Sequence, residues 1–370
     1  MAQIDLIRTS AGTPDPTRHI AYWLLCCCAL VFAMVVIGGV TRLTLSGLSI
    51  TEWNPIMGAI PPLDAADWQS QFDLYRQTPQ YKIVNAGMTL AEFKSIFWWE
   101  YVHRLLGRAI GVVFFLPFIY FAIRGRIDRG LAWRLATILA LGAMQGALGW
   151  FMVMSGLIER TSVSPYRLAA HLGLALVIYA CMLWLALDHL WPVPRGQGEN
   201  PVPPGQGENL VPPRQGENSP SRVARRLAAW IFFVMLSGAF VAGLHAGLVY
   251  NTFPLMDGRL VPDGLFDRSP LLANFFENVT TVQFDHRVLA LATLALVVAF
   301  WFSLKRRTLP PRARLAAGLL LFAVILQVAL GIATLLLVVP IPLAAAHQTG
   351  ALTLFSLALW LAHETRVARS

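Results

Sequence analysis

The sequence is short of charged residues and of cysteine, and each shortage excludes a class of protein. Only 13% of its 370 residues are charged, whereas 56% are apolar and collect into long uncharged runs. This pattern excludes an ordinary water-soluble domain and indicates an integral membrane protein. The four cysteines lie inside the apolar runs, so we expect no disulfide framework and interpret them as small core residues.

Eight apolar segments are long enough to cross roughly 30 Å of hydrocarbon as helices. They are residues 21–40, 98–123, 135–158, 168–187, 227–250, 288–304, 315–339 and 343–361. The first segment lacks a small-residue cleavage site, which argues against a removable signal peptide. We therefore predict an all-α membrane protein with eight transmembrane helices.

The positive charge is distributed unevenly along the chain. Of the 29 Lys and Arg residues, 18 fall in the segments 1–19, 124–134, 189–226, 305–314 and 363–370. The positive-inside rule places these segments in the cytoplasm, which predicts a multi-pass protein of the cell inner membrane with both termini, 1–19 and 364–370, inside. The net charge of +9 then faces anionic lipid headgroups, and no nucleic-acid partner is expected.

A polar segment, 190–226, divides the chain into halves at 20–189 and 227–363. It repeats a Gln-Gly-Glu-Asn unit among prolines and has almost nothing to bury, so we expect a disordered cytoplasmic linker. Four short segments recur in the same order in both halves. They are "GGVTRLTLSGLS" at 38 and "GAFVAGLHAGLV" at 238, "EYVHRLLG" at 100 and "QFDHRVLA" at 283, "MQGALG" at 144 and "LQVALG" at 326, and "AAHLGLAL" at 169 and "AAHQTGAL" at 345. The repetition predicts two duplicated four-helix bundles.

Four of the eight histidines, His103, His171, His286 and His347, occupy matched places in these segments. We predict that each lies at the start of a helix, near the periplasmic face. A single intramembrane histidine is more often an interhelical hydrogen-bond partner than a ligand. Duplicated pairs without an accompanying Asp, Glu or Cys set for zinc favour the two axial positions of haem iron instead.

Three arginines follow the first histidine of each pair. Arg104, Arg108 and Arg287 are expected to contact haem propionates, because guanidinium groups bind carboxylates in a bidentate manner. The alternative is snorkelling to the lipid headgroups. His245 breaks the symmetry, since Leu45 is its counterpart, and both a functional and a packing role stay open.

The remaining polar residues of the apolar runs have simpler interpretations. Gln145 and Gln327 lie in mid-membrane and are predicted to join helices. His19, His189 and His363 are expected to be solvated at the cytoplasmic ends.

The position three residues before the first histidine carries an ionisable residue in only one half. Glu100 precedes His103 by three residues and shares its helix face, whereas the matched position before His286 is Gln283, which cannot take up a proton. Glu100 is therefore a candidate catalytic residue that relays protons or acts as a base. The alternative is a structural ion pair with an arginine.

Several longer segments resemble one known family. They are "GGVTRLTLSGLSITEWNPIMGAIPPL" from Gly38, "YKIVNAGMTLAEFKSIFWWEYVHRLLGR" from Tyr81, "HAGLVYNTFPLMDG" from His245 and "QFDHR" from Gln283. The chain resembles the haem A synthase family of cytochrome oxidase assembly, in its alphaproteobacterial and mitochondrial branch. The resemblance implies an oxidoreductase that acts on a CH group. Such an enzyme oxidises the C8 methyl of haem O to a formyl by two hydroxylations and a dehydration, with water as the expected oxygen source, and supplies haem A to cytochrome c oxidase.

The resemblance also implies roles for the histidines and partners for the chain. His286 and His347 would bind one resident haem b, while His103 and His171 would be the axial ligands of the substrate haem O, with Glu100 beside them. The implied partners are haem O synthase, an electron-transfer partner and cytochrome oxidase assembly factors. The outer loop 41–97 is expected to be an ordered cover over the haem sites. Two other functions stay open from the residues alone, a bis-haem electron-transfer protein and a haem carrier.

Overall fold

The computed structural model describes residues 16–54, 57–158, 160–192 and 219–366. Most of the predicted linker 190–226 therefore lies outside the described residues, as do most of the N-terminal segment 1–19 and of the tail 364–370. Within the described ranges the chain is helical and contains no strand, which confirms the all-α class.

Eight long helices make up the body of the protein. They are α1 (Pro16–Leu43), α4 (Leu90–Ile123), α5 (Arg129–Ile158), α6 (Pro165–Leu190), α7 (Pro220–Gly243), α9 (Val279–Lys305), α10 (Pro311–Leu336) and α11 (Ile341–Glu364). Among the described residues, seven helices are long and apolar enough to span a membrane, and α11 is not one of them. His347, Gln348 and Thr349 lie near the start of α11 and lower its hydropathy. The predicted count of eight membrane spans is therefore not confirmed.

All eight long helices begin earlier than the apolar runs predicted, and α4 and α9 differ most. Helix α4 starts at Leu90 rather than at residue 98, behind a capping box in which Thr89 and Glu92 bond each other's backbone. Helix α9 starts at Val279 rather than at 288, behind Asn278, whose side chain accepts from the first turn. Polar first turns carry no hydropathy signal, so the prediction missed them. As a result His103 lies more than three turns inside α4, and the expectation that it begins a helix is wrong.

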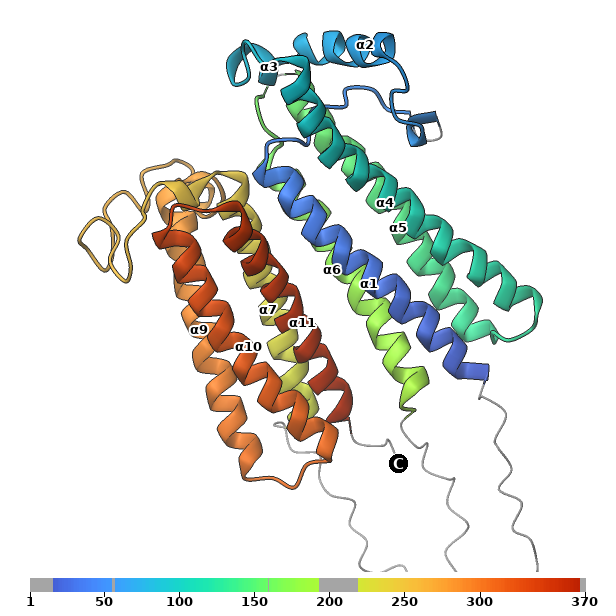
Figure 1. The fold of residues 1–370 in the computed structure, drawn as a ribbon. Coiled ribbons are helices and arrows are strands. Elements are labelled where there is room, and N and C mark those ends of the chain that lie inside the picture. The colour runs from blue at the N-terminus through green and yellow to red at the C-terminus, as the bar shows by residue number, and fades with distance from the viewer. Residues whose placement is uncertain (1–15, 55–56, 159, 193–218, 367–370) are drawn as a thin grey trace, which may run out of the picture.

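The helices form two bundles that lie side by side (Figure 1). One contains α1, α4, α5 and α6, and the other contains α7, α9, α10 and α11. Between the bundles, α6 packs against α7 and α1 packs against α11. Buried residues of both bundles, among them Leu24, Leu176, Ile231 and Leu352, belong to one continuous apolar core.

Polar contacts cross between the bundles at the end opposite to α2 and α3. Asp188 of α6 accepts from Arg366 at 2.6 Å and lies 3.2 Å from His363 Nε2 of α11. His363 is only 3% exposed, so the prediction that it is solvated is wrong. Among the cysteines, Cys26 and Cys181 are exposed, so only Cys27 and Cys28 are the buried core residues that we predicted.

The connection between α1 and α4 contains two short helices, α2 (Ala65–Arg76) and α3 (Pro79–Ile83), at one end of the molecule (Figure 1). Their aromatic side chains form a separate buried cluster with the first turns of α4. The cluster comprises Trp68, Phe72, Tyr75, Phe93, Phe97 and Tyr101. The segment thus has a core of its own, which the apolar surface of its aromatic residues required.

Candidate functional site

Each of the four matched histidine rings packs into the notch made by a glycine on a neighbouring helix. A β-carbon built on any of these glycines would lie between 2.8 and 3.1 Å from a ring atom, too close for a real side chain. The four pairs are His103 with Gly38, His171 with Gly149, His286 with Gly238, and His347 with Gly331. Both bundles therefore hold their histidines in the same way, as the duplication requires.

The sequence analysis missed these glycines as part of the site. They lie in the first and third of the recurring segments, at identical positions in both halves, and that recurrence is the signal that could have identified them. Glycine is needed there because an imidazole ring occupies the space of a β-carbon.

The two rings of the C-terminal pair face each other at close range. The ring centroids of His286 and His347 are 6.4 Å apart, and the ring planes are perpendicular at 88°. With metal–nitrogen bonds of about 2 Å, two imidazoles on opposite sides of one metal ion have centroids roughly 6 Å apart. The spacing therefore fits a haem iron between the two rings.

Both rings of this pair are held through the same nitrogen. Ser237 Oγ lies 2.8 Å from His286 Nδ1, and Gln327 Nε2 lies 3.1 Å from His347 Nδ1. No described residue forms a hydrogen bond with Nε2 of either ring. A metal-binding imidazole is commonly oriented through its second nitrogen in this way. The donor set therefore fits a haem, with Nε2 as the coordinating atom on each side.

The N-terminal pair is held less firmly. Gln145 Nε2 lies 3.2 Å from His171 Nδ1 and donates to the backbone carbonyl of His171 at 3.0 Å, much as Gln327 does for His347. The ring of His103, by contrast, has no hydrogen-bond partner among the described residues. The residue matched to Ser237 is Ile37, which has no group to offer. Both rings of the C-terminal pair are thus held by a side-chain hydrogen bond, whereas only the His171 ring of the N-terminal pair is.

Glu100 is buried and fully paired. Its Oε2 accepts from the Ser49 hydroxyl at 2.7 Å and from the Ile50 backbone N–H at 2.8 Å. Its Oε1 accepts from Arg104 Nη2 at 2.7 Å and from Arg104 Nε at 3.1 Å. Four hydrogen bonds therefore satisfy both oxygens of the buried carboxylate. Both predicted features, the ion pair with an arginine and the place beside His103 on one helix, are therefore present together.

The other half lacks this charge. Gln283 Nε2 donates to the backbone carbonyl of Tyr250 at 3.2 Å. In the first half the matched residues are Glu100 and Ile50, and there Glu100 accepts from the Ile50 backbone N–H. The direction of the hydrogen bond between helix and loop is therefore reversed between the halves.

The three predicted arginines hold the loops that follow α1 and α7. Arg104 donates to the carbonyls of Ile50 at 2.8 Å and Glu52 at 3.2 Å. Arg287 donates to the matched carbonyls, Tyr250 at 2.8 Å and Thr252 at 2.9 Å. Arg108 Nη2 donates to the Asn54 carbonyl at 2.9 Å. Their guanidinium groups thus lie beside the histidines and fasten each loop to its helix.

His245 lies just beyond the end of α7 and stands in a left-handed turn. Its φ of 53° matches the φ of 55° at Leu45, so the turn is duplicated although the side chain is not. Partial burial and the neighbouring Arg42 guanidinium lower the pKa of His245. The imidazole is therefore neutral at physiological pH, but it contacts neither histidine pair in any described hydrogen bond.

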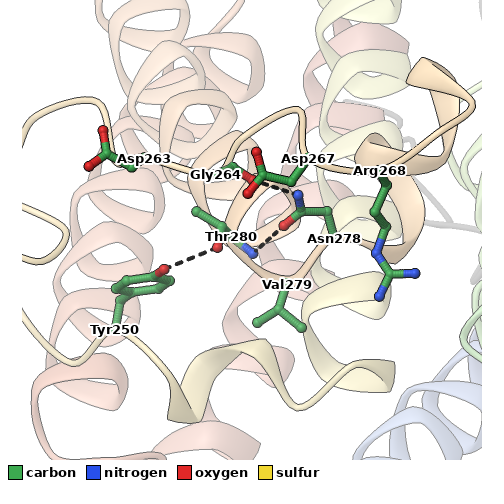
Figure 2. Close-up of a pocket in the computed structure, with 8 residues that line it drawn as sticks. All are labelled: Tyr250, Asp263, Gly264, Asp267, Arg268, Asn278, Val279 and Thr280. Atoms are coloured by element: carbon green, nitrogen blue, oxygen red, sulfur yellow. Dashed lines mark hydrogen bonds between the residues drawn. The ribbon is translucent and has the colours of Figure 1, made fainter.

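A surface pocket lies in the loop between α7 and α9, away from the histidine pairs (Figure 2). Its side chains pair with one another: Tyr250 Oη lies 3.0 Å from Thr280 Oγ1, and Asn278 donates to the Gly264 carbonyl at 2.7 Å. Asn278 also caps α9. The pocket is therefore part of the scaffold that presents the Tyr250 carbonyl to Arg287.

The comparisons with known proteins identify the family of the chain. Residues 21–359 match the family named COX15-CtaA, described as cytochrome oxidase assembly protein. The chain belongs to this family.

Relatives from bacteria and from cattle align over nearly the whole chain. A protein named Heme A synthase from Nitrosospira multiformis is 55% identical over 349 residues, which cover 94% of this chain and 94% of the relative. A Heme A synthase from Parvibaculum lavamentivorans is 50% identical over 94% of this chain and 95% of its own length. Heme A synthase COX15 from Bos taurus is 47% identical over 97% of this chain and 85% of its own length.

Proposed function

We propose that this protein is a haem A synthase, an oxidoreductase of the membrane that converts haem O to haem A. The observation that carries the proposal is the duplicated histidine pair, of which one copy is locked on both sides and the other stands beside the buried Glu100. A locked pair suits a permanent haem, whereas a looser pair suits a haem that must be bound and released. The names of relatives at 47–55% identity support this reaction.

The resident haem b is assigned to His286 and His347. When bound there, the haem would supply a redox centre, which His286 and His347 would hold through their imidazoles. Ser237 and Gln327 keep the two rings oriented by their Nδ1 atoms. Removal of such an orienting partner typically lowers metal affinity by roughly 10–100-fold.

The substrate haem is assigned to His103 and His171. A row of glycines runs along the helices next to these histidines: a β-carbon built on Gly111, Gly142 or Gly146 would meet no atom within 4 Å. The matched residues of the other half are the bulkier Leu294, Val324 and Val328, of which Val324 is fully buried. Haem O carries a long isoprenoid chain that haem b lacks. The extra space of the N-terminal half therefore favours it as the place for the larger haem.

Glu100 is proposed to accept the protons that the substrate loses. With water as the oxygen source, each hydroxylation of the methyl releases protons and electrons, so the site needs a proton acceptor and an exit for electrons. The donors from Ser49, Ile50 and Arg104 hold the carboxylate in place one turn from His103. Electrons would leave through a partner protein, and haem O would arrive from haem O synthase.

Arg104, Arg108 and Arg287 are proposed to turn toward the haem propionates. Each guanidinium follows a histidine of its own helix and donates to the loop at the α2 and α3 end of the molecule, which supports propionates pointing to that end. Basic loops at the opposite end, after α4 and after α9, support an inner-membrane orientation with both termini in the cytoplasm and the haem sites near the periplasmic face.

Pigment analysis tests the proposal directly. Cells that make haem O but no haem A should produce haem A when they express this chain, and the His103→Ala variant should not. Purified protein that holds two haems yet forms no haem A would instead indicate an electron-transfer protein. Ready loss of both haems during purification, again without haem A, would indicate a carrier.

A further inference from the structure

The two bundles meet along two interfaces that the duplication makes equivalent. Helix α1 packs on α11 in one, and α7 packs on α6 in the other. Gly39 and Gln348 lie in the first interface, and the residues matched to them in the second are Ala239 and Leu172. A polar pair in one interface thus stands where the other interface has an apolar pair.

Gln348 reaches across from α11 to the backbone of α1. Its Nε2 donates to the carbonyl of Val35 at 2.5 Å. Its amide also fills the space above Gly39, since a β-carbon built there would lie 2.3 Å from Oε1 and 2.7 Å from Nε2. A larger residue at position 39 would therefore displace the amide. The contact depends on both residues at once.

This contact lies directly between the two histidine sites. Gln348 follows His347, the ligand assigned to the resident haem. Gly39 follows Gly38, whose notch holds the ring of His103, with Nε2 3.0 Å from a β-carbon built on that glycine. A shift of α11 against α1 would therefore change the distance and the angle between the two histidine pairs.

We propose that Gln348 is a positioning residue that fixes the separation of the two haem sites by clamping α11 to α1 at Val35 and Gly39. The proposal rests on the haem A synthase function, because only that function gives the separation a consequence, namely passage of electrons from one haem to the other. A hydrogen bond between transmembrane helices is weak by itself. Its placement, between the neighbours of two ligands, gives it influence over the reaction. Displacement of reacting groups by about 1 Å can lower turnover by roughly a hundredfold.

The matched residues of the other interface indicate which variants to make. Gln348→Leu removes the amide, Gly39→Ala fills its space, and the double variant recreates the Leu and Ala pair of the matched interface. The double variant installs the residue types that the other interface has at the matched positions, Leu172 and Ala239, so it should fold and keep haem b. Ala239→Gly, in the other interface, is the control.

Turnover and affinity separate positioning from general stability. In both single variants and in the double variant we expect kcat to fall about tenfold or more, while KM for haem O and haem b content stay at the wild-type values. The double variant should be no worse than the worse single variant, because all three break one contact. Equal kcat in wild type and Gln348→Leu overturns the proposal, and so does a parallel loss of haem b and of kcat in the double variant.

A distance measurement tests the clamp without using activity. Spin labels on Val112→Cys of α4 and Leu296→Cys of α9, both exposed, report the separation of the bundles when Cys26 and Cys181 are replaced by serine. Pulsed electron paramagnetic resonance should give one narrow distance in the otherwise wild-type holoprotein and a shifted or broader one with Gln348→Leu. An unchanged distance overturns the clamp. Wild-type protein that makes no haem A overturns the proposed function instead, whatever the distance shows.

Discussion

Replacement of Glu100 by glutamine tests the buried carboxylate that the other half replaces with Gln283. The carboxylate accepts four hydrogen bonds, two on each oxygen, from Ser49, Ile50 and Arg104. Glutamine keeps one oxygen and turns the other into a donor. If the oxygen stays toward Arg104, the Ser49 hydroxyl can rotate to accept, but the Ile50 N–H loses its partner.

The stability cost follows from this count. One buried donor without a partner costs about 1–3 kcal/mol. A buried charge left without any partner would cost about 3–5 kcal/mol. The lower range applies, because Arg104 keeps its hydrogen bonds to the carbonyls of Ile50 and Glu52 and is therefore not left without a partner. The other half has glutamine, Gln283, at the matched position, and its arginine, Arg287, donates to backbone carbonyls alone. We therefore expect Glu100→Gln to fold and to hold haem b.

The effect on the reaction should be much larger than the effect on folding. Loss of a general base typically lowers a rate by about 10²–10⁴-fold. Haem O, its hydroxylated intermediate and haem A are separated by chromatography and normalised to bound haem b. We expect formyl production to fall by a factor in that range, with the hydroxylated intermediate accumulating.

Ser49→Ala is the matched control for this variant. It removes one hydrogen bond to the carboxylate and keeps the charge, so it should cost about 1 kcal/mol of stability and leave most activity. A stable Glu100→Gln protein with full activity per haem b would refute the catalytic role and leave Glu100 as a structural ion pair. Equal losses of activity in both variants would show that the network, rather than the proton acceptor, is what matters.

Three further predictions concern the haem sites. His286→Ala and His347→Ala should each lose haem b from the purified protein, and wild-type haem content in both spectra would show that the ligands are wrong. Ser237→Ala should weaken haem b binding by about 10–100-fold in a titration of the haem-depleted protein, because Ser237 orients His286 through Nδ1; unchanged affinity would remove this role. Gly146→Val, which installs the residue found at the matched position in the other half, should lower haem O binding and leave haem b content unchanged, and equal binding of haem O would exclude the glycine row from the substrate site.

The sequence predicted the class of protein, the duplication and the histidine pairs, because each depends on patterns that survive without coordinates. Long apolar runs identify membrane helices through their hydropathy alone. Recurrence of "EYVHRLLG" as "QFDHRVLA" relates His103 to His286 whatever the packing. The starts of α4 and α9 were predicted too late for the same reason, since their polar first turns lie outside the apolar runs.

Burial at the helix ends could not be predicted from composition. His363 was expected to be solvated because it lies at the end of a run among charged residues. It is buried instead, because Asp188 and Arg366 meet it from both bundles. Which charged residues face one another is decided by how the bundles pack, and no local pattern records it.

The sequence by itself determined that two equivalent halves would each carry two histidines, and that only one would carry a glutamate three residues before the first of them. The tertiary structure alone decided that His286 and His347 lie 6.4 Å apart, that four donors surround Glu100, and that Gln348 of one bundle rests on Gly39 of the other. The physical reason is that residue type and spacing along a helix fix which face a side chain occupies. Distances between helices depend instead on the packing of all the side chains between them, among which a single missing β-carbon can decide the contact.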